Sequence, residues 1–356
     1  MADADFSAPP AFEGDTEAEK LISSLRELRA FTDIPPISSR LPISYRRMPG
    51  PLRVRLARLI GRWQGRREHH WADFPGWPLD LSTDILSDWL SPRTSPFRDG
   101  PTPVVLTHDL DSAEGTRNLL ARFLDLEEAS GARSTNFVVP AAWPLDHGAL
   151  EEVKRRGHEL AVHGFDHSNR TAFSRPEERR DRLAAAGELI ERYAMVGYRA
   201  PSLLRTRALL KDLSNIYLYD SSIPTSGGPF PTANNGCATA RPFLIEGIAE
   251  LPLTMPRDGT LRFLGLDGDA ILALWRACAD QISEAGGVVV LLTHCEETFS
   301  GGDQMLDVYK RFLEYITSNS RFRWSSPMEI ISKAGLLTKP ANSQRLSAED
   351  AAAKLQ

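Results

Sequence analysis

Short β-type runs alternate with helical patterns between residues 101 and 335, and this alternation restricts the possible folds more than any other feature of the chain. Seven runs have strand character: 103–107, 135–139, 159–162, 196–199, 217–219, 250–253 and 288–293. Helical patterns lie between most of them, for example at 117–130, 148–157, 176–193 and 269–286. Strands that alternate with helices favour a parallel α/β architecture.

Such strands are compatible either with an incomplete (β/α) barrel or with an open, doubly wound sheet. Polar side chains help to separate the two. They fall at or just after the C-terminal ends of different runs: Asp109, His163, Arg199, Asp220 and His294. A barrel builds its site from many strand ends, whereas an open sheet concentrates its site at one switch point. The pattern favours the barrel.

Two carboxylates and two imidazoles at these strand ends have the composition of a metal site. Asp109 and Asp111 are separated by one residue, and His163 and His167 follow later in the chain, four positions apart. Each pair has a plainer interpretation, because acidic residues often cap helices and loop histidines often only donate hydrogen bonds. Their joint occurrence favours Asp111, His163 and His167 as ligands of a divalent metal, with Asp109 beside the metal as a base. That division of labour would make the protein a hydrolase.

Composition and charge argue against other classes of protein. The chain has 356 residues, a net charge of -5 and a pI of about 6.0, so it lacks the basic field that a nucleic acid would require. Its three cysteines, Cys237, Cys278 and Cys295, have no paired spacing, which favours a reducing compartment. No apolar run is long enough for a membrane span, and the N-terminus has no signal-peptide pattern. We therefore expect a cytoplasmic location.

Three regions of the chain differ in amino-acid composition and sequence pattern. Residues 1–100 form an N-terminal extension with an acidic tip that we expect to be disordered, an Arg-rich stretch, and a Pro/Ser-rich linker at 88–103. Residues 101–335 form the barrel, and 336–356 form a frayed or disordered tail. Within 51–67, apolar residues share one helical face and arginines crowd the rest. This segment either packs on the barrel or contacts an anionic membrane surface as a peripheral helix.

Five motifs occur in order: THDLD (107–111), HGFDH (163–167), GYRAPS (197–202), YDSS (219–222) and LLTH (291–294). Together they resemble the motifs of the NodB-homology polysaccharide deacetylase family, also called carbohydrate esterase family 4. The resemblance covers about residues 101–335 and is closest to the subgroup with DxD, YRAPS and YDSS motifs. It implies a distorted (β/α)7 barrel, N-terminal helical or irregular additions, and a divalent metal, usually zinc, with Co²⁺, Ni²⁺ or Mn²⁺ as alternatives.

The resemblance also implies roles for individual residues. Asp111, His163 and His167 would be the metal ligands, and Asp109 would be the general base. Arg199 would pair with the base, and the backbone N–H of Ser202 would help to form the oxyanion hole. His294 would be the general acid, and Asp220 would orient it. Asp220 has a structural alternative as half of a buried ion pair.

The chain departs from the family pattern at three positions. Leu110 separates two aspartates that are adjacent in many members, so the roles of Asp109 and Asp111 could be exchanged. His108 replaces a common Phe and would be an additional imidazole near the site, as a hydrogen-bonding partner of a ligand. Ser202 stands where the family usually has an aromatic residue, and without it the stacking surface for a long sugar polymer is smaller.

Other nucleophiles have weaker support. Ser221 and Ser222 lack a GxSxG elbow, so we interpret them as hydrogen-bonding residues. Cys295 follows His294 directly, and consecutive strand residues point to opposite sides, which argues against a catalytic thiol. His108, His147 and His158 are interpreted as structural or solvated residues and not as metal ligands.

The sequence therefore predicts metal-dependent removal of an acetyl group from an N-acetylated amino sugar, in a glycan or its precursor. Two alternatives remain open: hydrolysis of a non-sugar amide or cyclic imide, and a non-catalytic glycan-binding or scaffold protein. A scaffold has no need of both a base and an acid, which argues against the last. The oligomeric state does not follow from the sequence.

Overall fold

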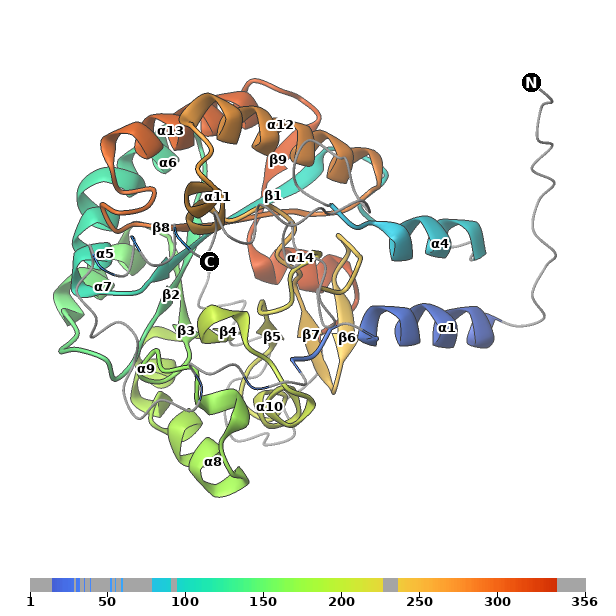
Figure 1. The fold of residues 1–356 in the computed structure, drawn as a ribbon, viewed down its shortest axis with the longest axis horizontal. Helices are drawn as coiled ribbons and strands as arrows, with labels where there is room; N and C mark the ends of the chain where they lie inside the picture. The colour runs from blue at the N-terminus through green and yellow to red at the C-terminus, as the bar shows by residue number, and fades with distance from the viewer. Residues whose placement is uncertain are drawn as a thin grey trace.

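The computed structural model describes residues 15–28, 30–32, 79–90, 95–226 and 236–337, together with positions 35, 39, 52, 55 and 59. Within these residues, nine strands form one curled sheet surrounded by helices (Figure 1). The strands are β1 Thr102–Leu110, β2 Ser134–Val138, β3 Glu159–His163, β4 Gly197–Arg199, β5 Tyr219–Asp220, β6 Phe243–Ile245, β7 Ile248–Glu250, β8 Val289–His294 and β9 Phe322–Trp324. The order across the sheet is β6-β7-β5-β4-β3-β2-β1-β8, and β9 pairs with the start of β1.

Nearly all neighbouring strands are parallel, as the alternating pattern predicted. Each of the seven predicted runs overlaps an observed strand. The exception to the parallel arrangement is the β6–β7 hairpin, which the sequence reasoning missed. Its strands are joined by Glu246 and Gly247, both at positive φ, which is the backbone geometry of a tight two-residue hairpin turn.

The two edges of the sheet approach each other without a continuous strand ladder. Thr254 Oγ1 donates to the carbonyl of Val288 at 2.9 Å, and the N–H of Met255 donates to Val290 O at 3.2 Å. The segment after β7 therefore lies beside β8. This arrangement confirms the predicted fold, a distorted barrel, and leaves the carboxyl ends of the parallel strands at one mouth.

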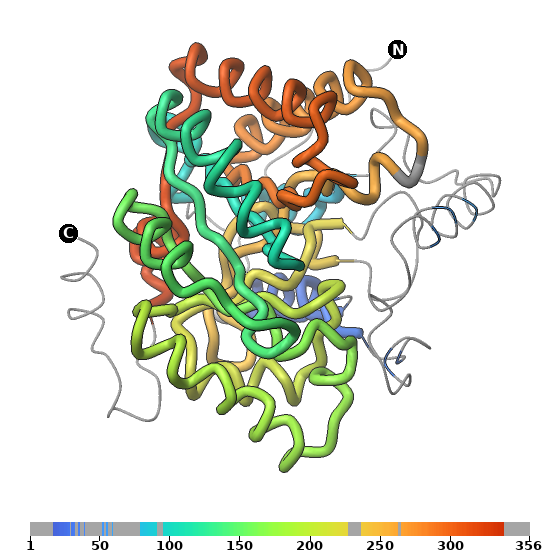
Figure 2. The backbone as a smooth tube through the Cα atoms, turned by 90° about the vertical axis from the view of Figure 1, so that its left-hand side faces the viewer, coloured from blue at the N-terminus to red at the C-terminus, as the bar shows by residue number. Residues whose placement is uncertain are grey.

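Helices cover the outside of the sheet, and Figure 2 shows α12 and α13 running side by side along one side of the molecule. The helices of the barrel region are α5 Ala113–Asn118, α6 Leu124–Ala129, α7 His147–Arg155, α8 Pro176–Ala184, α9 Gly187–Tyr193, α10 Arg207–Leu213, α11 Asp258–Leu264, α12 Gly268–Glu284, α13 Asp303–Thr317 and α14 Pro327–Lys333. Alternate strand residues divide between two cores. Leu106, Val162 and Tyr198 belong to one core with residues of the covering helices, whereas Val105 and Phe137 belong to a second, smaller one.

The described parts of the N-terminal extension pack on the barrel. Helix α1 (Asp15–Glu27) contacts α4 (Ser82–Leu90), and the carboxylate of Asp84 accepts hydrogen bonds from Ala240 N and Thr239 Oγ1. Asp88 forms a bidentate pair with Arg241 at 2.7 and 2.8 Å. The prediction of a linker from position 88 was therefore wrong at its start, because residues 88–90 complete α4.

Other predictions for the chain ends lie outside the described residues. They concern the tip at 1–14, the Arg-rich segment at 51–67 apart from positions 52, 55 and 59, and the tail from position 338. Among the described residues, no helix combines the length and the apolar character that a membrane span requires.

Candidate active site

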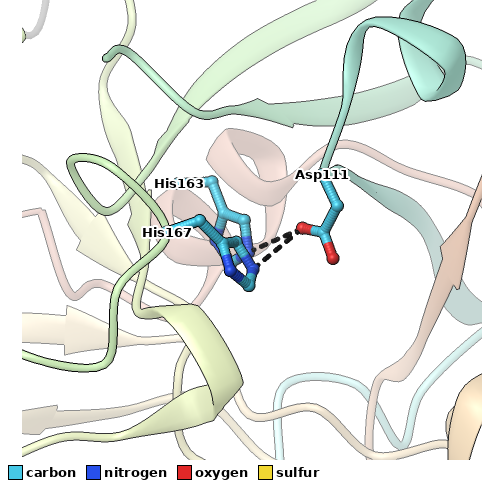
Figure 3. Close-up of side chains that lie close together, drawn as sticks. All are labelled: Asp111, His163 and His167. Atoms are coloured by element: carbon cyan, nitrogen blue, oxygen red, sulfur yellow. Dashed lines mark ion pairs between the residues drawn. The ribbon is translucent and has the colours of Figure 1, made fainter. Parts of the chain in front are cut away.

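Asp111, His163 and His167 converge at the carboxyl ends of β1 and β3, two strands that are separated by β2 in the sheet (Figure 3). Asp111 directly follows β1, His163 ends β3, and His167 lies in the loop after β3. Asp111 Oδ1 is 3.3 Å from His163 Nε2 and 3.1 Å from His167 Nε2. The three side chains are buried, and their candidate ligand atoms all lie within 4.8 Å of one another. A buried donor set of two imidazole nitrogens and one carboxylate fits a divalent transition metal and leaves coordination positions for other ligands.

A hydrogen bond to the backbone of Arg199 fixes the orientation of the His163 ring. Its Nδ1 lies 3.0 Å from the carbonyl oxygen of Arg199. Because a carbonyl only accepts, Nδ1 carries the hydrogen, and Nε2 is the nitrogen on the side of Asp111. Such a backbone contact is the usual way in which proteins select the metal-binding tautomer of histidine.

The loop between the two histidines packs tightly against the next motif. Gly164 has a φ of +66°, and a Cβ at this position would lie 2.4 Å from the Cγ of Pro201. Glycine therefore satisfies two requirements at once, a left-handed backbone and close approach to Pro201. This packing joins the HGFDH motif to the GYRAPS motif.

Arg182 holds the same loop from its other side, and the sequence reasoning missed it. From α8, its guanidinium donates to Asp166 Oδ1 at 2.5 Å, to Ser168 Oγ at 2.7 Å and to Thr171 Oγ1 at 3.0 Å. It also stacks on Phe165, with 4.6 Å between the guanidinium carbon and the ring centre. Nothing in the charged pattern of α8 separates Arg182 from its solvent-exposed neighbours.

Asp109 lies beside the ligand cluster but has a different partner. Its Oδ1 accepts a hydrogen bond from Arg199 Nη1 at 2.9 Å, and its Oδ2 is 3.5 Å from His163 Nε2. Burial raises the pKa of Asp109, but the charges of His163, Arg199 and His294 outweigh this effect and hold the pKa well below its ordinary value. Only Asp111 of the two aspartates lies close to both histidines, so the geometry favours it as the ligand.

Arg199 is immobilised on all sides, and its predicted contact with Asp109 is present. It donates to Thr107 Oγ1, to the carbonyl of Ser221 and to Ser221 Oγ, and it stacks on the ring of Phe137 at 3.9 Å. With no solvent exposure, the guanidinium supplies a fixed positive charge to the base of the site.

His294 ends β8 and faces the ligand cluster from the opposite side. Its Nε2 is 3.8 Å from Asp111 Oδ2, and its Nδ1 lies 2.8 Å from Asp258 Oδ1. The other oxygen of Asp258 accepts from the backbone N–H of His294 and from Ser300 Oγ, both at 2.8 Å. Burial lowers the pKa of His294, but the Asp258 carboxylate outweighs it, so the pKa is raised. The result is a histidine held in a fixed direction with a stabilised imidazolium form.

The prediction that Asp220 orients His294 was wrong, since Asp258 makes that contact. Asp220 pairs in register with Tyr198, on the opposite side of the sheet from Arg199, and accepts a hydrogen bond from Ser222 Oγ at 2.7 Å. Asp258 was missed because it follows a segment without the pattern of a strand.

Ser221 and Ser222 act as hydrogen-bonding residues, as predicted. Ser221 Oγ donates to Leu251 O at 2.9 Å, and Ser222 Oγ accepts from the N–H of Ala200 at 2.8 Å. The Ser222 contact supports the backbone next to Arg199, and Ser221 Oγ accepts a hydrogen bond from the Arg199 side chain. Ser202 lies two residues further along, in an exposed turn with φ 52° and ψ 19°. This left-handed conformation is rare for a residue with a side chain and often occurs at functional sites.

The other candidate side chains point away from the cluster. His108 was expected near the site, but it faces the helices, where its Nδ1 lies 2.8 Å from Thr293 Oγ1 and its Nε2 lies 2.7 Å from Glu127 Oε1. His158 belongs to the same buried group, in agreement with its structural interpretation. Cys295 is fully buried in the apolar core, and burial raises the pKa of its thiol well above the ordinary value. A thiol in this environment is a poor nucleophile.

Comparison with known proteins adds a family to this geometry. Residues 98–218 match the family model described as polysaccharide deacetylase. Over these residues, about a third of the chain, the sequence is similar to the polysaccharide deacetylase family. The family consists of hydrolases that act on carbon–nitrogen bonds, and its members generally depend on a divalent metal. Three motifs of the site, THDLD, HGFDH and GYRAPS, lie within the matched residues, whereas His294 and Asp258 lie beyond them.

Solved structures share the deacetylase fold. A protein from Mycobacterium smegmatis that has been assigned as a polysaccharide deacetylase is 22% identical, with a TM-score of 0.56 over 70% of this chain and 96% of that chain. A protein from Pseudomonas aeruginosa PAO1 with the same assignment is 16% identical, with a TM-score of 0.54 over 72% and 97%. The PuuE allantoinase is 17% identical, with a TM-score of 0.53 over 77% and 100%. At these identities the similarity concerns the fold. No curated protein matches the sequence.

Proposed function

We propose that this protein removes the acetyl group from an N-acetylated amino sugar, in a glycan or a glycan precursor, with the help of a divalent metal. One observation carries the proposal: the buried Asp111–His163–His167 cluster lies between Asp109, paired with Arg199, and His294, paired with Asp258. A ligand set, a charged base and an oriented acid are the groups that amide hydrolysis requires. The family match supports de-N-acetylation as the reaction.

Asp111, His163 and His167 would hold the metal. When bound, a divalent ion polarises the amide carbonyl and makes a water molecule more acidic. Two imidazoles and one carboxylate suit Zn²⁺, and Co²⁺, Ni²⁺ or Mn²⁺ can occupy such a site. The hydrogen bond from His163 Nδ1 to Arg199 O orients one ligand before any ion binds.

Asp109 would act as the general base. Its low pKa keeps it ionised, and Arg199 fixes one of its oxygens while the other faces His163 and the cluster. Asp109 accepts a proton as the oxygen of water forms a bond to the carbonyl carbon. The backbone N–H of Ser202, in the turn after Arg199, would donate to the oxyanion that develops on the carbonyl oxygen.

His294 would act as the general acid. Nδ1 is held by Asp258, so Nε2 is the nitrogen that faces the cluster and can donate a proton. It protonates the amine nitrogen as the carbon–nitrogen bond breaks, which releases a free amino sugar and acetate. An amine is a poor leaving group without this proton, so the raised pKa of His294 serves the step.

The experiment is a metal analysis combined with an acetate-release assay on N-acetylated amino sugars, their oligomers and nucleotide sugars. We expect about one metal ion per chain and acetate release that stops when a chelator removes the ion and resumes with Zn²⁺. If the metal-loaded protein released no acetate from any amino sugar but hydrolysed a cyclic imide, the proposed substrate class would be wrong. If the protein bound no metal, the proposed metal-dependent activity would be wrong, and the non-catalytic scaffold would be the remaining interpretation.

A further inference from the structure

Two acidic side chains behind the site, Asp220 and Glu250, lie opposite each other on the parallel strands β5 and β7. Both side chains have no solvent exposure. We propose that they share one proton, carried by Glu250, and that the pair positions the backbone of residues 199–202. The shared proton is independent of the proposed function, whereas the effect of this backbone on catalysis rests on it.

In each carboxyl group of the pair, one oxygen accepts a hydrogen bond and the other has no donor in the part of the chain that the structure describes. Asp220 Oδ1 accepts from Ser222 Oγ at 2.7 Å, and Glu250 Oε1 accepts from the N–H of Ile223 at 2.8 Å. Asp220 Oδ2 and Glu250 Oε2 are also buried, and no N–H or O–H group of the described residues donates to either. Two buried carboxylates without donors repel each other and lose their hydration. One proton between them turns the repulsion into a hydrogen bond.

The buried charges around the pair support the same proton count. Two buried arginines act on the pair: Arg205, only 5% exposed, acts on both carboxyl groups, and Arg199, which is hydrogen-bonded to Asp109, lowers the pKa of Asp220 against the larger effect of burial. Because Asp109 already pairs with Arg199, one negative charge on the pair balances Arg205. The other ionisable groups that face the pair and its arginine are Tyr198, Tyr219, Cys237 and Arg257. Burial raises the pKa of Tyr219 well above its ordinary value. Burial raises the pKa of Cys237 to about 12 and that of Tyr198 further still, so both stay neutral.

The ionisation tendencies assign the proton to Glu250. Burial raises the pKa of Asp220 to about 6 and the pKa of Glu250 well above its ordinary value. Glu250 is therefore the acid that stays protonated near neutral pH, and Asp220 is the anion.

The pair connects to the site through one serine. Anionic Asp220 accepts the Ser222 hydroxyl hydrogen, which turns the Ser222 oxygen toward the N–H of Ala200 at 2.8 Å. Ala200 lies between Arg199 and the turn that carries Ser202 in its left-handed conformation. The pair therefore acts as a positioning device for this turn, and neither carboxyl group touches the cluster.

Infrared spectroscopy tests the proton directly. We expect metal-loaded wild-type protein near pH 7 to show the carbonyl band of a buried, protonated carboxylic acid, and Glu250→Gln to lack it. Glu159→Gln is the matched control, because burial also raises the pKa of Glu159, which accepts a hydrogen bond from Thr135 in β2. A band that is absent from the wild type, or unchanged in Glu250→Gln, would overturn the shared proton whether or not the protein releases acetate.

Unfolding across a pH series gives a second test. An acid whose pKa is raised on folding stabilises the fold fully below its unfolded pKa of about 4.3, and this stabilisation is lost as the pH rises through the folded pKa. Between about pH 5 and 7, the wild-type folding equilibrium should therefore fall by up to about tenfold per pH unit relative to Glu250→Gln. Equal slopes for the two proteins would contradict the proposal.

Amide substitutions test the positioning role. Asp220→Asn and Glu250→Gln each keep one carboxylate opposite Arg205, so each variant should stay folded. In the double variant Arg205 loses its counter-charge, and the loss of stability should exceed the sum of the two single effects. If the turn is positioned by the pair, a double variant that still folds should retain its metal but lose acetate release. Additive stability effects with unchanged turnover would overturn this role.

Discussion

The guanidinium of Arg199 lies 2.9 Å from the carboxylate of Asp109, and both side chains are buried. Arg199 also donates to Thr107 and Ser221, so its planar fork satisfies three partners at fixed angles. A lysine ammonium cannot reproduce this geometry. We expect Arg199→Lys to lower kcat by about 10–100-fold and to leave metal binding largely intact. Steady-state kinetics with metal analysis would check this, and wild-type kcat would show that the fork does not position the base.

Asp258 should control the pH dependence of the reaction. Its carboxylate raises the pKa of His294, and His294 must be protonated to act as an acid. Removing the charge in Asp258→Asn lowers that pKa, so the descending limb of the kcat profile should move to lower pH by about one unit or more. Asp303→Asn, at an exposed carboxylate on the surface, is the control. If the descending limb of the kcat profile stayed at the same pH in Asp258→Asn, Asp258 would not control the pKa of His294.

Gly164→Ala tests the contact between two motifs. The substitution places a methyl group against the Pro201 ring and forces alanine into a left-handed backbone. Gly131 has a similar φ of +73° but open space where a Cβ would lie, so Gly131→Ala measures the backbone term alone. We expect the backbone term to cost about 1 kcal/mol of unfolding free energy, and Gly164→Ala to cost about 1–3 kcal/mol more and weaken metal binding. Equal effects in denaturant unfolding would mean that the loop tolerates the methyl group.

Arg182 should support metal affinity although it is not a ligand. It fixes Asp166 and Ser168, which flank His167 in the chain. We expect Arg182→Gln to weaken metal binding by about 10–100-fold in a chelator competition assay. Arg180→Gln, on the exposed side of the same helix, should bind metal as the wild type does. If the two variants matched, the loop would not need its arginine.

Much of the fold and part of the site followed from the sequence because parallel strands end at one mouth. The polar residues Asp109, His163 and His294 could be placed together from that rule and from the spacing of their motifs. The rule fails for Asp220, because a residue at a strand end faces either the site or the covering helices, and a two-residue strand gives no alternation from which to decide.

The residues that the sequence did not reveal act through tertiary contacts. Asp258 reaches His294 from the start of α11, and Arg182 reaches the metal loop from α8. Neither contact has a local periodicity or a turn signal. The short strands β6 and β9 were missed for a related reason, since three residues are too few to establish a pattern.

The central claim is that Asp111 holds the metal while Asp109 takes the proton. Metal content and acetate release of Asp109→Asn, measured beside Asp111→Asn and His163→Ala, test it most directly. We predict that Asp109→Asn keeps about one metal ion per chain and loses about 10²–10⁴-fold in kcat, whereas the other two variants lose both metal and turnover. Normal turnover in Asp109→Asn, or loss of its metal while Asp111→Asn retains it, would contradict this assignment.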